Sequence, residues 1–219
     1  MPRINRGLVD EGVYHVLNRG NGRQEVFHRE DDYAGFVELI KKAKRRYAVK
    51  LFGYCLMPNH YHMVVMIEEA EELSRWMQWL MTSHVRRYHR EHESNGHVWQ
   101  GRYKSFVIES DDHLLTVMRY VEGNPVRAGL AGSAIEWRWS SHAEVIGKKE
   151  RQIIDELPID LPDGWSRYVD EPLTEKEIDR VRESVKRQCP YGRREWIAEV
   201  SSQFGLESTL RPRGRPKKK

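Results

Sequence analysis

The order in which two apolar patterns alternate along the chain restricts its fold more than any other feature of the sequence. Short runs rich in β-branched and aromatic residues predict strands, and longer runs with apolar residues three or four apart predict amphipathic helices. The β-α-β-β-α-β start of this order matches the ferredoxin-like plan, an antiparallel sheet with helices on one face. The predicted fold class is therefore α+β, with the second face of the sheet left open for a further helix or a ligand. We expect strands at 13–20, 49–57, 60–67 and 103–109, and helices at 31–47, 70–92 and 111–124.

The sequence after residue 130 has a different character. Two tryptophans in the segment IEWRWSSHAEVIG are expected to pack back on the core, and residues 150–170 are irregular and interrupted by proline. Helices are expected at 174–188 and 192–205, followed by a basic tail, RPRGRPKKK, which we expect to be disordered because it has six cations and no acid. The predicted organisation is a main domain, an irregular linker and a helical C-terminal region with the tail, at 1–146, 147–173 and 174–219.

Composition excludes several classes of protein. The 219 residues include 37 Lys and Arg against 33 Asp and Glu, a net charge of +4 that is compatible with a nucleic-acid partner. No apolar run approaches the ~20 residues of a membrane span, and the N-terminus lacks the apolar stretch of a signal peptide. Because Cys55 and Cys189 are far apart in sequence, no disulfide framework is indicated, and a reducing cytoplasm is expected.

Two histidines begin the third predicted strand, directly after a Pro-Asn turn. Alternate residues of a strand share a face, so His60 and His62 project together while Tyr61 points the other way, towards the helices. Two imidazoles at this spacing can bind one divalent cation if a third ligand is present. The alternative is a pair of strand histidines with ordinary hydrogen bonds.

A second pair of chemically able residues lies near the end of the last core helix. Tyr120 and Asn124 are four residues apart, which places them on one helix face. An amide oxygen can bind a metal, and a tyrosine hydroxyl can act as a nucleophile that forms a covalent intermediate. The alternative is that Tyr120 packs in the core and that Asn124 only ends the helix before Pro125.

Four segments together resemble the single-tyrosine HUH transposases, named for a histidine pair around a bulky residue, and most closely the bacterial REP-associated tyrosine transposases. The four segments, in order, are YHVLNRG, MPNHYHMVV, WQGRYKSF and RYVEGNPVRAGL. The resemblance covers residues 12 to about 145, with WRWSSH as a further match. The segment GLESTLRPRGRP resembles the tail of some members.

The resemblance implies a fold like the predicted one and assigns roles to the residues above. His60 and His62 match the metal-binding pair, Asn124 the third ligand and Tyr120 the nucleophile that attacks a DNA phosphate. The implied activity is metal-dependent cleavage and transfer of single-stranded, hairpin-forming DNA through a 5′-phosphotyrosine. Nitrogen and oxygen ligands suit Mg²⁺ or Mn²⁺. The implied location is the cytoplasm, at the nucleoid, and a monomer and a homodimer both remain possible.

Basic and aromatic residues near these segments are candidates for holding the DNA strand by phosphate contacts and base stacking. For each of the cations, an ordinary solvated surface charge is the alternative. The RPRGRP stretch resembles an AT-hook core that enters narrow A·T grooves, and a general phosphate-binding tail is its alternative. The DNA-binding candidates are Arg19, Arg23, Arg102, Tyr103, Lys104, Arg211, Arg213 and Arg215.

Three other functions compete with this interpretation. A domesticated DNA-binding protein without transposition activity would not need the intact set of His60, His62, Tyr120 and Asn124. An RNA-binding module of the RRM type would carry stacking aromatics in an RNP run, and no such run is visible. A metal-dependent hydrolase that uses water would not need Tyr120. A covalent protein–DNA adduct distinguishes the transposase from all three.

Overall fold

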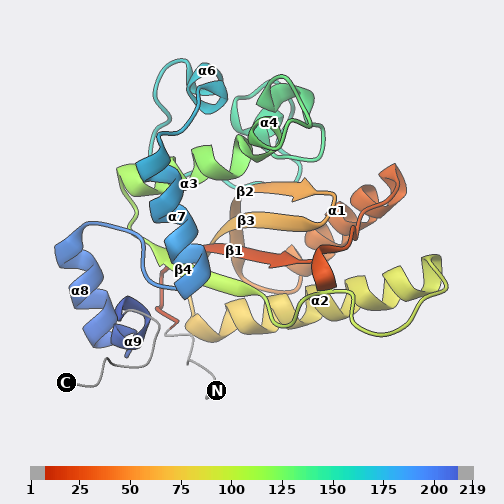
Figure 1. Cartoon of the computed structure of the whole chain (residues 1–219), viewed down its shortest axis with the longest axis horizontal. Helices are drawn as coiled ribbons and strands as arrows, with labels where there is room; N and C mark the ends of the chain where they lie inside the picture. The colour runs from red at the N-terminus through yellow and green to blue at the C-terminus, as the bar shows by residue number, and fades with distance from the viewer. Residues whose placement is uncertain (1–7, 212–219) are drawn as a thin grey trace, which may run out of the picture.

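A four-stranded antiparallel sheet forms the centre of the protein, whose computed structural model describes residues 8–211 (Figure 1). The strand order is β2-β3-β1-β4, as the ferredoxin-like plan requires, and the predicted α+β fold class is confirmed. The strands β2 and β3 are joined by the Pro58-Asn59 turn, and Leu17 of β1 lies opposite His62 of β3. The strands are β1 (Val13–Arg19), β2 (Val49–Met57), β3 (His60–Ile67) and β4 (Lys104–Ile108).

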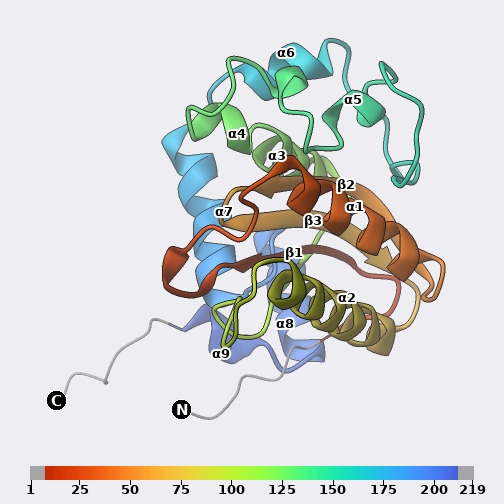
Figure 2. The same ribbon diagram turned by 90° about the vertical axis from the view of Figure 1, so that its right-hand side faces the viewer.

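Helices α1 (Glu30–Lys44) and α2 (Ala70–Glu91) cover one face of the sheet (Figure 2). The start of α1 is held by the Asp32 carboxylate, which accepts hydrogen bonds from two backbone N–H groups that precede the helix. Tyr61 is fully buried on this side, where its ring lies 5.3 Å from that of Phe36. The predicted alternation of strand β3 is therefore confirmed, because Tyr61 faces the helices and the flanking histidines face away.

The opposite face carries a further helix, as expected, and is partly covered by α3 (Asp112–Glu122) and α7 (Glu175–Arg187) (Figure 1). The prediction of one helix over 111–124 is wrong at its end. Helix α3 stops at Glu122, and after Gly123 a short helix, α4 (Asn124–Arg127), begins. Pro125 has no N–H to continue the hydrogen-bond ladder of α3, so the chain starts a new turn there, with proline in the first turn that tolerates it.

Loops and short helices make up the remaining described chain, and the segment 147–173 is packed rather than extended. Its Ile153, Ile154 and Trp165 are buried, and helix α6 (Trp165–Asp170) lies against α3. The boundaries predicted at residues 146 and 173 stay a prediction. The remaining helices are η1 (Asn21–Arg23), η2 (Ala134–Glu136), α5 (His142–Val145), α6 (Trp165–Asp170), α8 (Arg194–Gln203) and α9 (Glu207–Leu210).

Trp165→Ala should lower the free energy of unfolding by about 3–5 kcal/mol, the usual cost of removing a buried large aromatic ring. The indole is 4 % exposed and donates a 2.9 Å hydrogen bond to the buried Glu122 carboxylate, which also contacts His142 at 2.7 Å. Urea denaturation followed by circular dichroism measures the change, with Leu130→Ala, at an exposed position, as the control. Equal stability of the two variants would show that 147–173 contributes nothing to the fold.

Candidate active site

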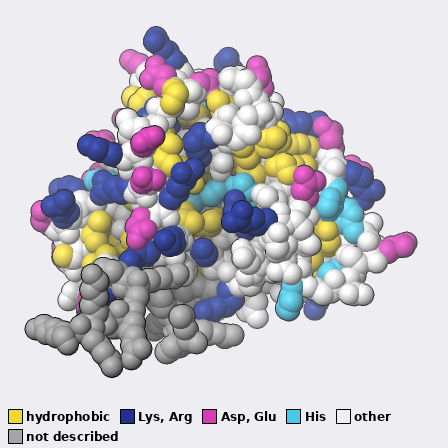
Figure 3. Space-filling model, viewed as in Figure 1, with side chains coloured by type: hydrophobic (Ala, Val, Ile, Leu, Met, Phe, Trp, Pro, Cys, Tyr) yellow, Lys and Arg dark blue, Asp and Glu magenta, His cyan; other side chains and the backbone are white. Residues whose placement is uncertain are grey.

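A pocket of about 690 Å³ opens between the sheet and the helices of its second face. In Figure 3, histidine surface lies near the middle of the viewed face, with Lys and Arg side chains on either side of it. Strands β1 and β3 form the floor, α3 and α4 one wall, and α7 and the start of β4 the other. The pocket is lined by Leu17, Asn18, Arg19, His60, His62, Gln100, Arg102, Lys104, Tyr120, Asn124, Arg127, Ala128, Arg182 and Val185.

A neighbouring side chain contacts the Nδ1 of each of the two histidines. The His62 Nδ1 lies 2.7 Å from Nε2 of His15, a fully buried residue of β1 whose ring is parallel to that of His62. The His60 Nδ1 is 2.7 Å from the side-chain oxygen of Asn59. The Nε2 of His60 in turn lies 3.5 Å from the side-chain amide nitrogen of Asn124. Each ring is thus oriented through Nδ1, the arrangement that second partners impose on metal-binding histidines.

Burial keeps these histidines neutral. It lowers the pKa of His60 to about 4 and that of His15 to about 3, and it holds the pKa of His62 well below its usual value. Positive charge from Arg19 and Arg127 acts in the same direction on His60 and His62. A neutral imidazole is the form that binds a metal, so the pair is ready for a cation at neutral pH.

Tyr120 stands between the histidines and a guanidinium group. Its ring is 9 % exposed and meets the edge of His62 at 5.7 Å between centroids. The Cζ of Arg127 lies 4.2 Å from the centroid of the Tyr120 ring, and Nη2 donates a 2.7 Å hydrogen bond to the Tyr120 carbonyl. Burial lowers the pKa of Arg127, while its electrostatic interaction with Tyr120 opposes that change. Within residues 8–211, no carboxylate forms an ion pair with Arg127, so its charge remains available to an anion.

The electrostatics of the pocket favour a polyanion. Five cationic side chains line it, and no acidic side chain does so in the described part of the chain. Three of the five were expected from the sequence as DNA contacts, and two were missed, as was His15. Arg127 lies within the RYVEGNPVRAGL segment, so its position beside Tyr120 could have been suspected. The five are Arg19, Arg102, Lys104, Arg127 and Arg182.

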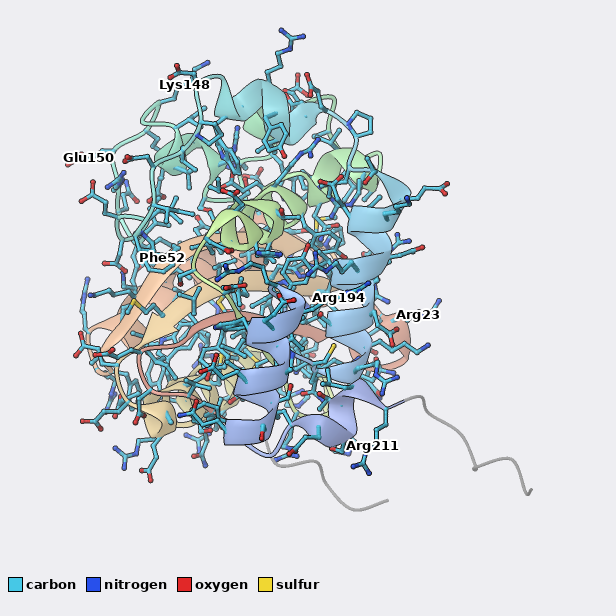
Figure 4. The ribbon with its side chains drawn as sticks, turned by 90° about the vertical axis from the view of Figure 1, so that its left-hand side faces the viewer. Arg23, Phe52, Lys148, Glu150, Arg194 and Arg211 are labelled. Carbon is cyan, nitrogen blue, oxygen red and sulfur yellow. The ribbon has the colours of Figure 1, made fainter. Side chains whose placement is uncertain are left out.

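The other expected DNA contacts lie elsewhere. Tyr103 is 7 % exposed and lines a neighbouring groove beside α2 instead of this pocket. Arg23 and Arg211 are exposed and project outward from the protein, Arg23 from the 3₁₀ helix η1 and Arg211 just after α9 (Figure 4). Arg213 and Arg215 lie outside the described residues, as does most of the basic tail.

The donors around the histidine pair fit a divalent cation. The His60 Nε2 lies 3.5 Å from the Asn124 amide nitrogen, and the His62 ring centroid lies 5.0 Å from that of His60, so half a turn of the amide would present its oxygen to the histidine pair. A second cluster, Glu109, Asp111 and His113, also brings three possible ligand atoms together. There, however, the Arg193 guanidinium and backbone N–H already bind both oxygens of Glu109. This second cluster therefore holds the start of α8 against the end of β4.

The neutral histidines predict acid sensitivity. The folded pKa of His15 is about 3, below the unfolded value of about 6.5, so its contribution to stability is complete above pH 6.5 and is lost as the pH falls towards 3. The free energy of unfolding of the wild type should fall between pH 6 and pH 5. In His15→Gln, this fall should be smaller by about 1 kcal/mol. Urea denaturation at both pH values measures this, and the exposed His97→Gln is the control. An unchanged slope would mean that His15 is protonated in the folded protein.

Comparison with known proteins gives concordant results. The sequence model of IS200-like transposases matches residues 9–124, more than half of the chain. A Haemophilus influenzae protein described as a REP-associated tyrosine transposase is 24% identical over 122 residues, which are 50% of this chain and 69% of that protein. The structure of a REP-associated tyrosine transposase bound to a REP hairpin superposes with a TM-score of 0.58 at 17% identity, covering 80% of this chain and 100% of the other. Within residues 8–211, every helix is too short or too polar to cross a lipid bilayer.

Proposed function

Because the chain belongs to the IS200-like transposase family, we propose that it cuts and rejoins single strands of DNA through a covalent bond to Tyr120. The observation that carries this proposal is the convergence of the Tyr120 ring, the His60–His62 pair and Asn124 of one chain on a pocket lined by cations. A phenol beside a pair of metal-binding imidazoles suits nucleophilic attack on an anionic phosphodiester. If water were the nucleophile, Tyr120 would have no part in the reaction.

In the proposed reaction, the Tyr120 oxygen attacks a DNA phosphorus, and the bond from phosphorus to the 3′ oxygen breaks. The phenol loses its proton, and the departing 3′ oxygen gains one, so the step leaves a 5′-phosphotyrosine and a free 3′-hydroxyl. Attack on that linkage by a second 3′-hydroxyl restores the phenol and joins a new pair of ends. The phosphodiester count is unchanged, so no nucleotide cofactor is needed.

Arg127 is the residue that we assign to the negative charge of this step. Its guanidinium lies against the Tyr120 ring and has no carboxylate partner among the described residues. A fixed cation at this place stabilises the negative charge that builds up on the phosphoryl oxygens, because the guanidinium is already oriented before the reaction. Arg19, Arg102, Lys104 and Arg182 around the rim would hold the neighbouring phosphates.

We assign His60, His62 and Asn124 to a divalent cation, with Mg²⁺ or Mn²⁺ suited to this mixture of nitrogen and oxygen donors. When bound, the cation would supply Lewis-acid polarisation of the scissile phosphate. His15 would act through His62 by holding its Nδ1, so that the Nε2 stays in place.

His15→Phe should weaken Mn²⁺ binding by about tenfold to a hundredfold, the usual effect of removing a partner that orients a metal ligand. Isothermal titration calorimetry of the DNA-free protein measures the affinity without any activity assay. The matched control is His84→Phe, which replaces a buried histidine on the other side of the sheet and should bind Mn²⁺ as the wild type does. Equal affinities of both variants would remove His15 from the metal site.

We propose single-stranded DNA with an adjacent hairpin as the substrate, since a related transposase of the same fold was solved bound to a REP hairpin. The test is incubation with a labelled hairpin oligonucleotide and Mn²⁺, followed by denaturing electrophoresis. A slowly migrating covalent adduct supports the proposal. Binding without cleavage would instead indicate a domesticated DNA-binding protein, and cleavage without an adduct would indicate a hydrolase. The cytoplasmic location and the choice between monomer and dimer stay predictions.

A further inference from the structure

A second groove, of about 810 Å³, runs beside the candidate active site between α2 and the segment 96–103. Its volume lies within the ~300–1,000 Å³ of typical ligand pockets. The α2 residues of the lining recur at intervals of three and four, so one stripe of this helix forms a wall of the groove. The groove is lined by Asn18, Ser74, Met77, Gln78, Met81, Thr82, Val85, Arg86, Gly96, His97, Val98, Trp99, Gly101, Arg102 and Tyr103.

The lining combines an apolar interior with a polar, cationic rim. Buried Met77, Val98 and Trp99 supply apolar and aromatic surface. Exposed Arg86 and Arg102 supply positive charge, and the described lining contains no acid. A flat, uncharged group attached to an anionic chain would match this surface, because its faces prefer apolar contacts and its chain prefers cations.

The groove is continuous with the candidate active site. Asn18 and Arg102 line both cavities, and the Asn18 amide donates a 3.1 Å hydrogen bond to the Gly101 carbonyl in the wall between them. Gly101 has a φ of 118°, which a side chain would strain, and this conformation shapes the shared wall. The Gln100 N–H donates to the Arg19 carbonyl at 2.8 Å, which attaches the wall to β1.

We propose that this groove binds one unpaired nucleobase of the DNA strand that flanks the cut, with adjacent phosphates on Arg102 and Arg86. The inference rests on the proposed function, since the strand must pass through the neighbouring pocket to reach the groove. The base would stack within the apolar interior, and the amides of Asn18 and Gln78 could bind its polar edge. An apolar peptide would also suit the interior, but it would not use the two cations or the continuity with a cationic pocket.

The first experiment measures DNA binding without divalent metal, so that no cleavage is involved. The probe is a synthetic hairpin with single-stranded extensions, in which each flanking nucleotide is made abasic in turn. Fluorescence anisotropy should show one abasic position that weakens binding about tenfold to a hundredfold, the usual effect of losing one stacked base. Uniform affinity at every abasic position would overturn the proposal.

Substitutions then locate the base. Thr82 is exposed on the α2 wall, and Thr82→Trp should fill the groove, weaken binding of the intact probe and remove the penalty of the critical abasic position. Arg86→Gln should weaken binding severalfold, whereas its matched control Arg90→Gln, exposed on the same helix outside the groove, should have a smaller effect. An abasic penalty that persists in Thr82→Trp, or equal effects of Arg86→Gln and Arg90→Gln, would place the base elsewhere. A missing adduct in the cleavage assay would refute the proposed function while leaving these metal-free affinities interpretable.

Discussion

Tyr120→Phe should form no covalent adduct with DNA, a loss of at least about a thousandfold in the rate of adduct formation. Phenylalanine keeps the ring, its edge contact with His62 and its place beneath the Arg127 guanidinium, so only the attacking oxygen is removed. The variant should therefore fold, bind Mn²⁺ and bind hairpin DNA almost as the wild type does. If Tyr120 were only a packing residue, the cost would be one hydrogen bond, about 1 kcal/mol, and the adduct would persist.

Denaturing electrophoresis with labelled hairpin DNA and Mn²⁺ compares wild type and variant. The matched control is Tyr103→Phe, since Tyr103 is a buried tyrosine outside the candidate active site. This control should keep its adduct. A heat-stable, slowly migrating band in Tyr120→Phe that is absent from Tyr103→Phe would move the nucleophile to Tyr103 and refute the present assignment.

His60→Ala and His62→Ala should each abolish metal-dependent cleavage while leaving most of the DNA affinity. Removing a direct ligand should weaken Mn²⁺ binding by about a hundredfold or more, beyond the loss expected from a residue that only orients a ligand. DNA affinity depends mainly on Lys and Arg contacts to phosphates, and the five cations of the pocket remain in both variants.

Calorimetry with Mn²⁺ and anisotropy with hairpin DNA, measured on the same preparations, separate the two effects. His28→Ala, at an exposed position that lines neither the pocket nor the neighbouring groove, is the control and should match the wild type in both assays. A folded His60→Ala that binds Mn²⁺ normally, or that loses DNA affinity as completely as cleavage, would count against a role for His60 in metal binding.

The sheet and the direction of the histidine pair were predictable from the sequence because both depend on local periodicity. The alternation around Tyr61 and the order of the strands determine which face His60 and His62 occupy. The break at Gly123 was harder to predict, since the periodicity of Tyr120 and Asn124 fits one helix as well as two. Both side chains still line one pocket, because the chain continues in a helical turn after the break.

The missed residues depend on tertiary structure. His15 contacts His62 only through the pairing of β1 with β3, and a one-residue change of register would turn it to the other face. Arg182 comes from α7, more than fifty residues after Tyr120, and its position requires the packing of α7 against β4 and α3. No local pattern encodes either contact. Tyr103, just before β4, lines a groove together with residues of α2, which is another contact that no local pattern encodes.

The presence of one phenol in a pocket built from a single chain has a consequence for stoichiometry. In the proposed reaction, Tyr120 can carry only one DNA end at a time, and it is occupied until another 3′-hydroxyl releases that end. A protein with two such phenols could hold both ends of a segment in one pocket. Here, a segment bounded by two cuts would require either two chains, each holding one end, or two successive turnovers of one chain. Counting covalently bound ends per chain in a quenched reaction should therefore give a value that does not exceed one.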